Sequence, residues 1–264
     1  MKCVIMKIAA GSILVMIVCF ASSCQKQIHQ DIAQAGATFN LNLHFKAVVD
    51  AAPLEFDKPY RNYFKEIYSV KTFKYYISDL TLINSNADKV VKVAENSYFL
   101  IDESAAGTEY IGIKAPANKY DRIAFTIGVD SVRNVSGAQT GALDPANGMF
   151  WTWNSGYIMA KLEGNSPLST EADNRIQYHI GGFKKADDVL KKVVLSFPGN
   201  TALEFLANSY STITITANVN AWFNNPNELH IAQVPVCMTP GDLSKKIAAN
   251  YSKMFSLVNV ENNR

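Results

Sequence analysis

Histidine is the residue type that most clearly offers this sequence a metal-binding chemistry, because a neutral imidazole nitrogen is a common metal ligand. His179 stands in the segment Gln177-Tyr-His-Ile-Gly-Gly182. A strand is predicted to end there, and the two glycines open the chain, so a ligand at this place would be both fixed and reachable. We interpret His179 as the first candidate ligand, with a hydrogen-bonded structural role as the alternative.

His44 is the second candidate ligand. It lies in residues 39–47, where apolar and polar residues alternate strictly and predict a strand. His44 is on the polar side of that strand with Asn42 and Lys46. On this pattern alone, a solvated surface histidine is the plain interpretation.

Tryptophan is concentrated in one place. Trp151 and Trp153 stand one residue apart within the segment from Met149 to Gly164. In a β-strand, the side chains of residues i and i+2 point to the same face, so both indole rings would face one side of the sheet. Two core tryptophans of a β-protein are the plain explanation, and a ring close to a ligand site is the alternative.

The common catalytic patterns are missing from this sequence. It has no Gly-x-Ser-x-Gly elbow, phosphate-binding loop, dinucleotide fingerprint or His-Glu-x-x-His motif. Acidic residues such as Asp102 and Glu163 are scattered, and a sequence does not show whether two of them face each other. We therefore predict a protein that is not an enzyme, and an envelope hydrolase is an unsupported option.

The N-terminus predicts export and lipid attachment. Lys2 and Lys7 flank the beginning of an apolar run, Ile8 to Ala21. This run is too short to span a bilayer and has the layout of a secretion signal. The run ends in Ala21-Ser-Ser-Cys24, which resembles the lipobox of bacterial lipoproteins, with Cys24 as the lipidated residue. We expect a signal peptide over residues 1–23 and a flexible tether over 24–37. An ordinary soluble export signal is the alternative.

The charge and cysteine content narrow the partners. The chain has 25 Lys+Arg and 23 Asp+Glu, and the predicted signal holds two of the lysines, leaving 23 of each. A neutral mature chain gives no electrostatic case for nucleic acid or for an anionic membrane surface. Cys237 is alone once the signal is removed and Cys24 is lipidated, so we expect no internal disulfide.

The remaining patterns predict an all-β fold: an antiparallel β-sandwich with one C-terminal α-helix packed on it, forming a single domain over residues 38–264. The helix would follow a capping box in which Thr239 is the N-cap and Asp242 reaches back to it. The predicted strands cover residues 39–47, 72–83, 97–101, 120–129, 156–163, 175–180, 192–197, 211–219 and 255–260.

Several motifs follow one another in a specific order: Lys74-Tyr-Tyr-Ile-Ser78, Ser97-Tyr-Phe-Leu-Ile101, Phe125-Thr-Ile-Gly-Val-Asp-Ser131, Gly141-Ala-Leu-Asp-Pro145, Met149 to Gly164, and Gln177 to Gly182. In this order they resemble the MbnP-like copper-binding domain family, and more narrowly its lipoprotein branch common in Bacteroidetes. The C-terminal Met238-Thr-Pro-Gly and Ile247-Ala-Ala-Asn-Tyr-Ser-Lys-Met-Phe255 also fit, so the similarity covers about residues 38–260.

The resemblance implies a secreted β-sandwich that binds copper. In characterised relatives, a partner dihaem enzyme of the MbnH type oxidises a tryptophan to kynurenine, which supports copper binding together with histidine. Imidazole nitrogen suits copper, and kynurenine adds an amine and a carbonyl that indole lacks. Carried over to this sequence, His179 is the first ligand and His44 the second. Trp151 or Trp153 is the residue to be modified, and their spacing does not choose between them.

One departure from the family pattern concerns the C-terminus. Relatives of this type often end in a segment resembling Asp-His-Val-His-Asn, where this chain has Val258-Asn-Val-Glu-Asn262. Asn259 and Glu261 are harder ligands, which suit calcium or manganese better than cuprous copper. Calcium or another divalent ion is therefore the alternative to copper.

Together, these observations predict a metal-binding protein of the cell envelope, held at the outer membrane only through its N-terminal lipid, on the periplasmic or the surface face. Copper is the expected metal, and a dihaem peroxidase of the MbnH type is the expected partner. The alternative is a non-enzymatic envelope binding module, in which Trp151, Trp153 and Trp222 form an aromatic platform for a carbohydrate or protein.

Overall fold

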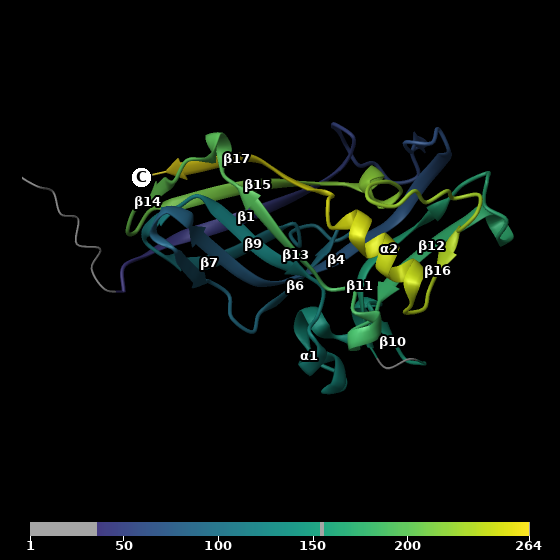
Figure 1. Cartoon of the computed structure of the whole chain (residues 1–264), viewed down its shortest axis with the longest axis horizontal. Coiled ribbons are helices and arrows are strands. Elements are labelled where there is room, and N and C mark those ends of the chain that lie inside the picture. The colour runs from purple at the N-terminus through teal and green to yellow at the C-terminus, as the bar shows by residue number, and fades with distance from the viewer. Residues whose placement is uncertain (1–35, 154–155, 264) are drawn as a thin grey trace, which may run out of the picture. The chain divides into compact units, whose positions relative to one another are not determined.

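Two β-sheets carry the fold in the computed structural model, which describes residues 36–153 and 156–263 (Figure 1). The first sheet has the strand order β17-β15-β1-β2, with β7 also paired to β1, and the second has the order β13-β9-β4-β11-β12-β16. The short strands β3, β5 and β6 pair with β4, and β10 pairs with β11, while β14 and β8 pair with each other. The predicted β-sandwich is confirmed.

The strands are β1 (Thr38–Val49), β2 (Ala52–Pro53), β3 (Tyr60–Arg61), β4 (Ile67–Asn84), β5 (Lys89–Lys92), β6 (Tyr98–Asp102), β7 (Tyr110–Pro116), β8 (Asn118–Tyr120), β9 (Arg122–Ile127), β10 (Phe150–Trp151), β11 (Gly156–Asn165), β12 (Arg175–Gly181), β13 (Lys191–Ser196), β14 (Leu203–Phe205), β15 (Tyr210–Asn218), β16 (Val236–Cys237) and β17 (Phe255–Asn263). The helices are α1 (Ser131–Val135) and α2 (Asp242–Tyr251), and the 3-10 turns are η1 (Ser85–Ala87), η2 (Gly141–Leu143), η3 (Pro145–Asn147), η4 (Ala172–Asn174), η5 (Lys185–Asp187), η6 (Pro198–Asn200) and η7 (Val219–Trp222).

Aromatic side chains join the two sheets. Phe45 of β1 contacts Tyr75 of β4 at a ring-centroid distance of 6.2 Å and Phe125 of β9 at 5.7 Å. All three are at most 1 % exposed. Edge-to-face pairs of this kind add to the apolar area that each ring buries. The alternation that predicted a strand at residues 39–47 therefore marks the side of β1 that faces the second sheet.

Strand direction differs from the prediction in two places. Most pairs are antiparallel, but β1 and β15 are parallel, as are β12 and β16. No hairpin links either pair, so the packing of their inward side chains, and not a turn, sets their direction. The single predicted helix of any length is present as α2, which lies beside β12 and β16 (Figure 1).

The predicted start of that helix is wrong. The N-cap of α2 is Gly241, which has a φ of 142° and makes no side-chain capping bond, and the helix begins at Asp242. The backbone turns at Gly241, in a conformation that only glycine adopts readily. Thr239 is thereby separated from the first helical turn and does not cap it.

The predicted strands at residues 39–47, 72–83, 97–101, 120–129, 156–163, 175–180, 192–197, 211–219 and 255–260 are confirmed as β1, β4, β6, β9, β11, β12, β13, β15 and β17, with different ends. The strand β7 was missed, although Ile111, Ile113 and Ala115 alternate within it. The prediction that Trp151 and Trp153 share one strand is wrong. Trp151 ends β10, and Trp153 lies in the turn that follows.

The predicted signal peptide, Cys24 and the predicted tether as far as residue 35 lie outside the described residues. Within residues 36–153 and 156–263, no helix has the length and apolar character needed to cross a membrane.

Gly164 generates a prediction about the sheet. The β11–β4 register shifts between Glu163 and Gly164, and a Cβ at Gly164 would lie 1.8 Å from the backbone oxygen of Ser69. We expect Gly164→Ala to lower the free energy of unfolding by about 3 kcal/mol, because the two strands must separate locally. Denaturant unfolding measures this loss.

Gly112 of β7 is the matched control, because a Cβ there would meet nothing within 4 Å. Gly112→Ala should leave the stability unchanged or raise it by up to about 1 kcal/mol. Equal losses from the two substitutions would contradict the close approach of β11 and β4.

Candidate metal-binding site

A row of polar side chains crosses four neighbouring strands on the outer face of the second sheet. Asp102 of β6 is directly opposite Lys74 of β4, Lys74 is opposite Lys161 of β11, and Lys161 is opposite His179 of β12. Their neighbours Tyr75, Leu162 and Tyr178 are buried on the inner face. Because successive side chains in a strand alternate between faces, the four polar residues point outward together. We call them the outer polar row.

A carboxylate beside this row, that of Glu163, holds His179. Nε2 of His179 lies 2.6 Å from Oε1 of Glu163, and the side chains are 9 % and 28 % exposed, respectively. The hydrogen bond with His179 lowers the pKa of the Glu163 carboxyl to about 2, although burial acts in the opposite direction. An ionised Glu163 accepts a hydrogen bond from Nε2–H of His179. In this tautomer the neutral imidazole has its free lone pair on Nδ1. Many metal-binding histidines are oriented by a carboxylate in this way.

Trp151 packs against the same strand as His179. Gly181 is two residues beyond His179 in β12, and a Cβ built on Gly181 would lie 2.5 Å from Cζ3 of Trp151. The indole therefore occupies the space that a side chain at position 181 would fill. Trp151 is 4 % exposed, and its buried Nε1 has no hydrogen-bond partner in the structure.

Trp153 is on the surface and covers Trp151. It is 61 % exposed, and the two ring centroids are 5.5 Å apart with the planes inclined at 40°. Trp222, the third tryptophan of the expected aromatic platform, is 1 % exposed and packs on Tyr251. Trp153 is thus the one tryptophan of that set with a broadly exposed ring.

The segment 141–149, which leads into β10, is fastened to the sheet through its backbone. Four side chains of β4 and β11 each donate a hydrogen bond to one of its carbonyl oxygens: Tyr76 to Ala142, Tyr157 to Leu143, Lys74 to Asn147 and Lys161 to Gly148. Lys74 also pairs with Asp102 at 2.7 Å. Burial lowers the pKa of the Lys161 ammonium. These contacts position the chain immediately before Trp151.

His44 is on the opposite side of the sandwich. It is next to Phe45, which faces the core, so the imidazole points outward from the first sheet and stacks on Tyr110 at 4.3 Å. Burial, then the charge of Lys46, lowers the pKa of His44. Because both sheets lie between His44 and His179, the structure does not bring the two predicted ligands together.

Asn259 and Glu261 lie on the same face as His44. In the first sheet, Thr214 of β15 is opposite His44 on one side and opposite Asn259 on the other. The backbones of His44 and Asn259 are therefore two strand spacings apart, about 9.5 Å. Asn259 Nδ2 donates to Glu261 Oε1 at 2.8 Å.

The donors of the unmodified chain are few. Within residues 36–153 and 156–263, no group of three or more His, Cys, Asp or Glu side chains is arranged to hold a metal. Cys237 is buried, and burial raises the pKa of its thiol to about 11, so it is not a thiolate at neutral pH. Sequence reasoning missed the outer polar row. The alternation of polar and apolar residues at Lys161 and Glu163 indicates that both side chains point outward. It does not indicate the strand pairing that aligns Lys161 with Lys74 and His179.

The Glu163–His179 contact predicts a pH dependence. The pKa of Glu163 is lower in the folded chain, about 2, than its ordinary value of 4.5. Its contribution to the free energy of unfolding is therefore full above pH 4.5 and disappears as the pH falls toward 2. We expect Glu163→Gln to cost about 1–3 kcal/mol at neutral pH and almost nothing near pH 2. Urea unfolding of both proteins across this range measures the difference.

Glu171, an exposed residue 3.5 Å from Arg175, supplies the control for that experiment. Glu171→Gln should cost less than about 1 kcal/mol at any pH, because exposed ion pairs contribute little. A pH-independent effect of Glu163→Gln would mean that the ionised carboxylate does not stabilise the folded chain through His179.

Comparisons with known proteins agree with this architecture. The chain is similar to the solved structure of MbnP from Methylosinus trichosporium, with a TM-score of 0.52 and 16 % sequence identity, over 78 % of this chain and 83 % of that chain. At this identity the likeness shows the fold alone. A search of curated proteins found no match. The sequence model of the MbnP family matches residues 38–239, which include every strand except β17 and the whole outer polar row. This chain belongs to the MbnP family.

Proposed function

We propose that this protein is a copper-binding protein of the cell envelope without catalytic turnover of its own. The observation that carries the proposal is the position of Trp151 beside a histidine whose tautomer is set by a carboxylate. His179 would coordinate the metal through Nδ1 while Nε2 stays with Glu163. Membership of the MbnP family supports copper as the metal.

The donor set fits copper only if Trp151 is modified. One imidazole nitrogen is a weak site by itself, and the residues described here add no further cluster of ligands. Opening the indole ring of Trp151 would turn its unpartnered ring nitrogen into an aryl amine and create a carbonyl on the same side chain. Both groups would belong to a side chain that packs over Gly181, two residues from His179. We therefore propose Trp151, and not Trp153, as the residue that is converted to kynurenine.

The modification needs an external oxidant. Cleavage of the C2–C3 bond of the indole by two molecules of hydrogen peroxide adds two oxygen atoms and releases two molecules of water. Hydrolysis of the resulting N-formyl group then releases formate and leaves kynurenine. We propose a dihaem peroxidase of the MbnH type as the partner that uses the peroxide. Trp153, exposed and stacked on Trp151, is the part of this site that such a partner reaches first.

The proposed location is the outer membrane, with Cys24 carrying the lipid. The alternative, a module that binds a carbohydrate or protein, is supported here only by the exposure of Trp153. A glycan array that shows binding abolished by Trp153→Ala, in protein without metal, would favour this alternative over copper binding.

The ligand assignment predicts the effect of three variants on copper content. In protein made in the periplasm with its partner peroxidase, we expect His179→Ala to lose bound copper. Glu163→Gln should weaken binding by about 10- to 100-fold, because the carboxylate orients the imidazole. His44→Ala is the control and should keep its copper. Metal analysis of the purified proteins, with competition titration for affinity, checks this. Loss of copper from His44→Ala but not from His179→Ala would place the site on the other sheet.

The site of modification is tested separately. Peptide mass spectrometry across residues 149–161 should find kynurenine at position 151 and unmodified tryptophan at position 153. Trp151→Phe should lose copper, and Trp153→Phe should keep both the modification and the metal, though with slower modification. Kynurenine at position 153, or intact Trp151 in copper-loaded protein, would show that the proposal has chosen the wrong residue.

A further inference from the structure

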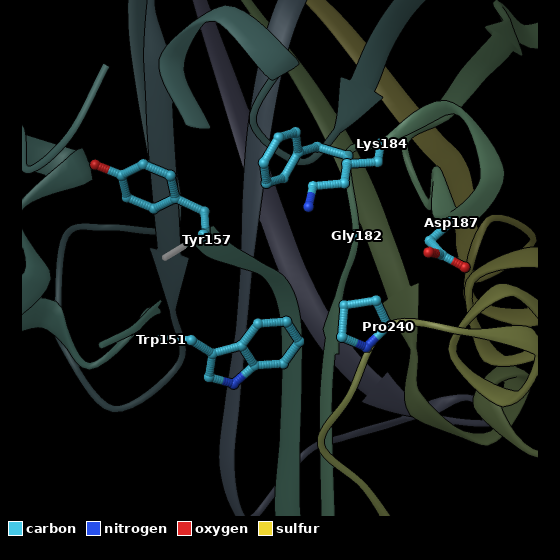
Figure 2. A pocket seen from close by; sticks show the side chains of 8 residues that line it. Trp151, Tyr157, Gly182, Lys184, Asp187 and Pro240 are labelled. Atoms are coloured by element: carbon cyan, nitrogen blue, oxygen red, sulfur yellow. The ribbon is translucent and has the colours of Figure 1, made fainter. Parts of the chain in front are cut away.

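A cavity of about 230 Å³ adjoins the indole of Trp151. Phe183 and Pro240 form other parts of its wall, and Lys184 stands at its border. In Figure 2, the indole extends toward Pro240, and the Lys184 ammonium points into the same space from the opposite side. The cavity therefore combines aromatic and apolar walls with one ammonium group, that of Lys184, and one carboxylate, that of Asp187.

Two glycines in the wall lie close against neighbouring residues. Gly182 has a φ of +136°, and a Cβ there would lie 2.1 Å from the backbone oxygen of Asp187. At Gly156, a Cβ would come within 3.2 Å of the Phe183 ring. Neither position accepts a side chain without movement of its neighbours, so the wall of the cavity is closely packed where β11 begins and β12 ends.

Two ionic side chains line the cavity, the ammonium of Lys184 and the carboxylate of Asp187. Among the ion pairs of the described residues, none involves Lys184. The other ionic residue in the wall, Asp187, is next to Lys245 of α2, which donates a hydrogen bond to Ala186 O at 3.1 Å. Asp242 and, after it, Asp187 raise the pKa of Lys245. In Figure 2, the carboxylate of Asp187 lies on the side of the cavity nearer α2, whereas the ammonium of Lys184 points into the cavity, where a ligand can reach it.

We propose that this cavity binds a small aromatic carboxylate, with its ring against Trp151 and Phe183 and its carboxylate paired with Lys184. The volume suits such a molecule, since a cavity of about 150 Å³ already accommodates benzene. Aromatic walls favour a planar ring, and an ammonium–carboxylate contact is a charge-assisted hydrogen bond. This ligand would use neither His179 nor Glu163, but its ring would pack on the indole of Trp151, so the inference concerns the chain in which Trp151 is unmodified.

Benzoate is the probe for a first test by isothermal titration calorimetry, with the full chain free of metal. We expect a Kd on the order of 0.1–1 mM, typical of a ligand with so few atoms. Lys184→Gln should weaken binding at least about tenfold, a loss equal to one charge-assisted contact. Lys184→Arg should restore it, and Lys185→Gln, one residue further along the exposed turn, should leave it unchanged. Benzoate should also quench tryptophan fluorescence in the wild type and not in Trp151→Phe.

Benzylamine tests the sign of the charge, because it has a similar ring and an ammonium in place of the carboxylate. It should bind at least about tenfold more weakly than benzoate, since it brings a like charge to Lys184. The proposal is overturned if the wild type does not bind benzoate, if benzylamine binds equally well, or if Lys184→Gln and Lys185→Gln behave alike. Copper content, measured on separate samples, reports on the metal site alone.

Discussion

The packing of Phe45 against Tyr75 and Phe125 across the two sheets decides the direction of every side chain that could act chemically. Because neighbours in a strand face opposite ways, burying Phe45 sends His44 outward from the first sheet. Burying Tyr75 likewise sends Lys74 outward from the second sheet, together with the residues opposite it. A slip of one residue in any of these strands would exchange core and surface. The outer polar row is thus the reverse side of the aromatic core.

That constraint separates the chemistry of this chain onto two faces. One face presents His179 with Glu163 and Trp151, and the other presents His44 stacked on Tyr110. The positions at which relatives often have C-terminal histidines fall on the second face, as Asn259 and Glu261 do here. Their replacement therefore alters the surroundings of His44 and leaves those of His179 untouched. The proposed copper site does not depend on the C-terminal segment.

The alternation at residues 39–47 and 156–163 was enough to predict β1 and β11, because half-buried strands show their two faces in the sequence. The place of His179, at the end of a strand before two glycines, was also predictable. The residues aligned with His179 in the outer polar row were not predictable. Lys161 is close in the chain, but Lys74 is about a hundred residues away, and only strand pairing aligns them. The start of α2 was mispredicted because the torsion of Gly241 outweighed a good capping sequence.

The segment 141–149 shows how such a sheet can present a loop. Every one of the four contacts from Tyr76, Tyr157, Lys74 and Lys161 is made to a main-chain oxygen, and every residue type has one. The side chains of β4 and β11 therefore determine the path of the segment, and most of the segment's own side chains remain free to vary. A loop with different surface chemistry could be exchanged into this place and still deliver Trp151 to the same position over Gly181.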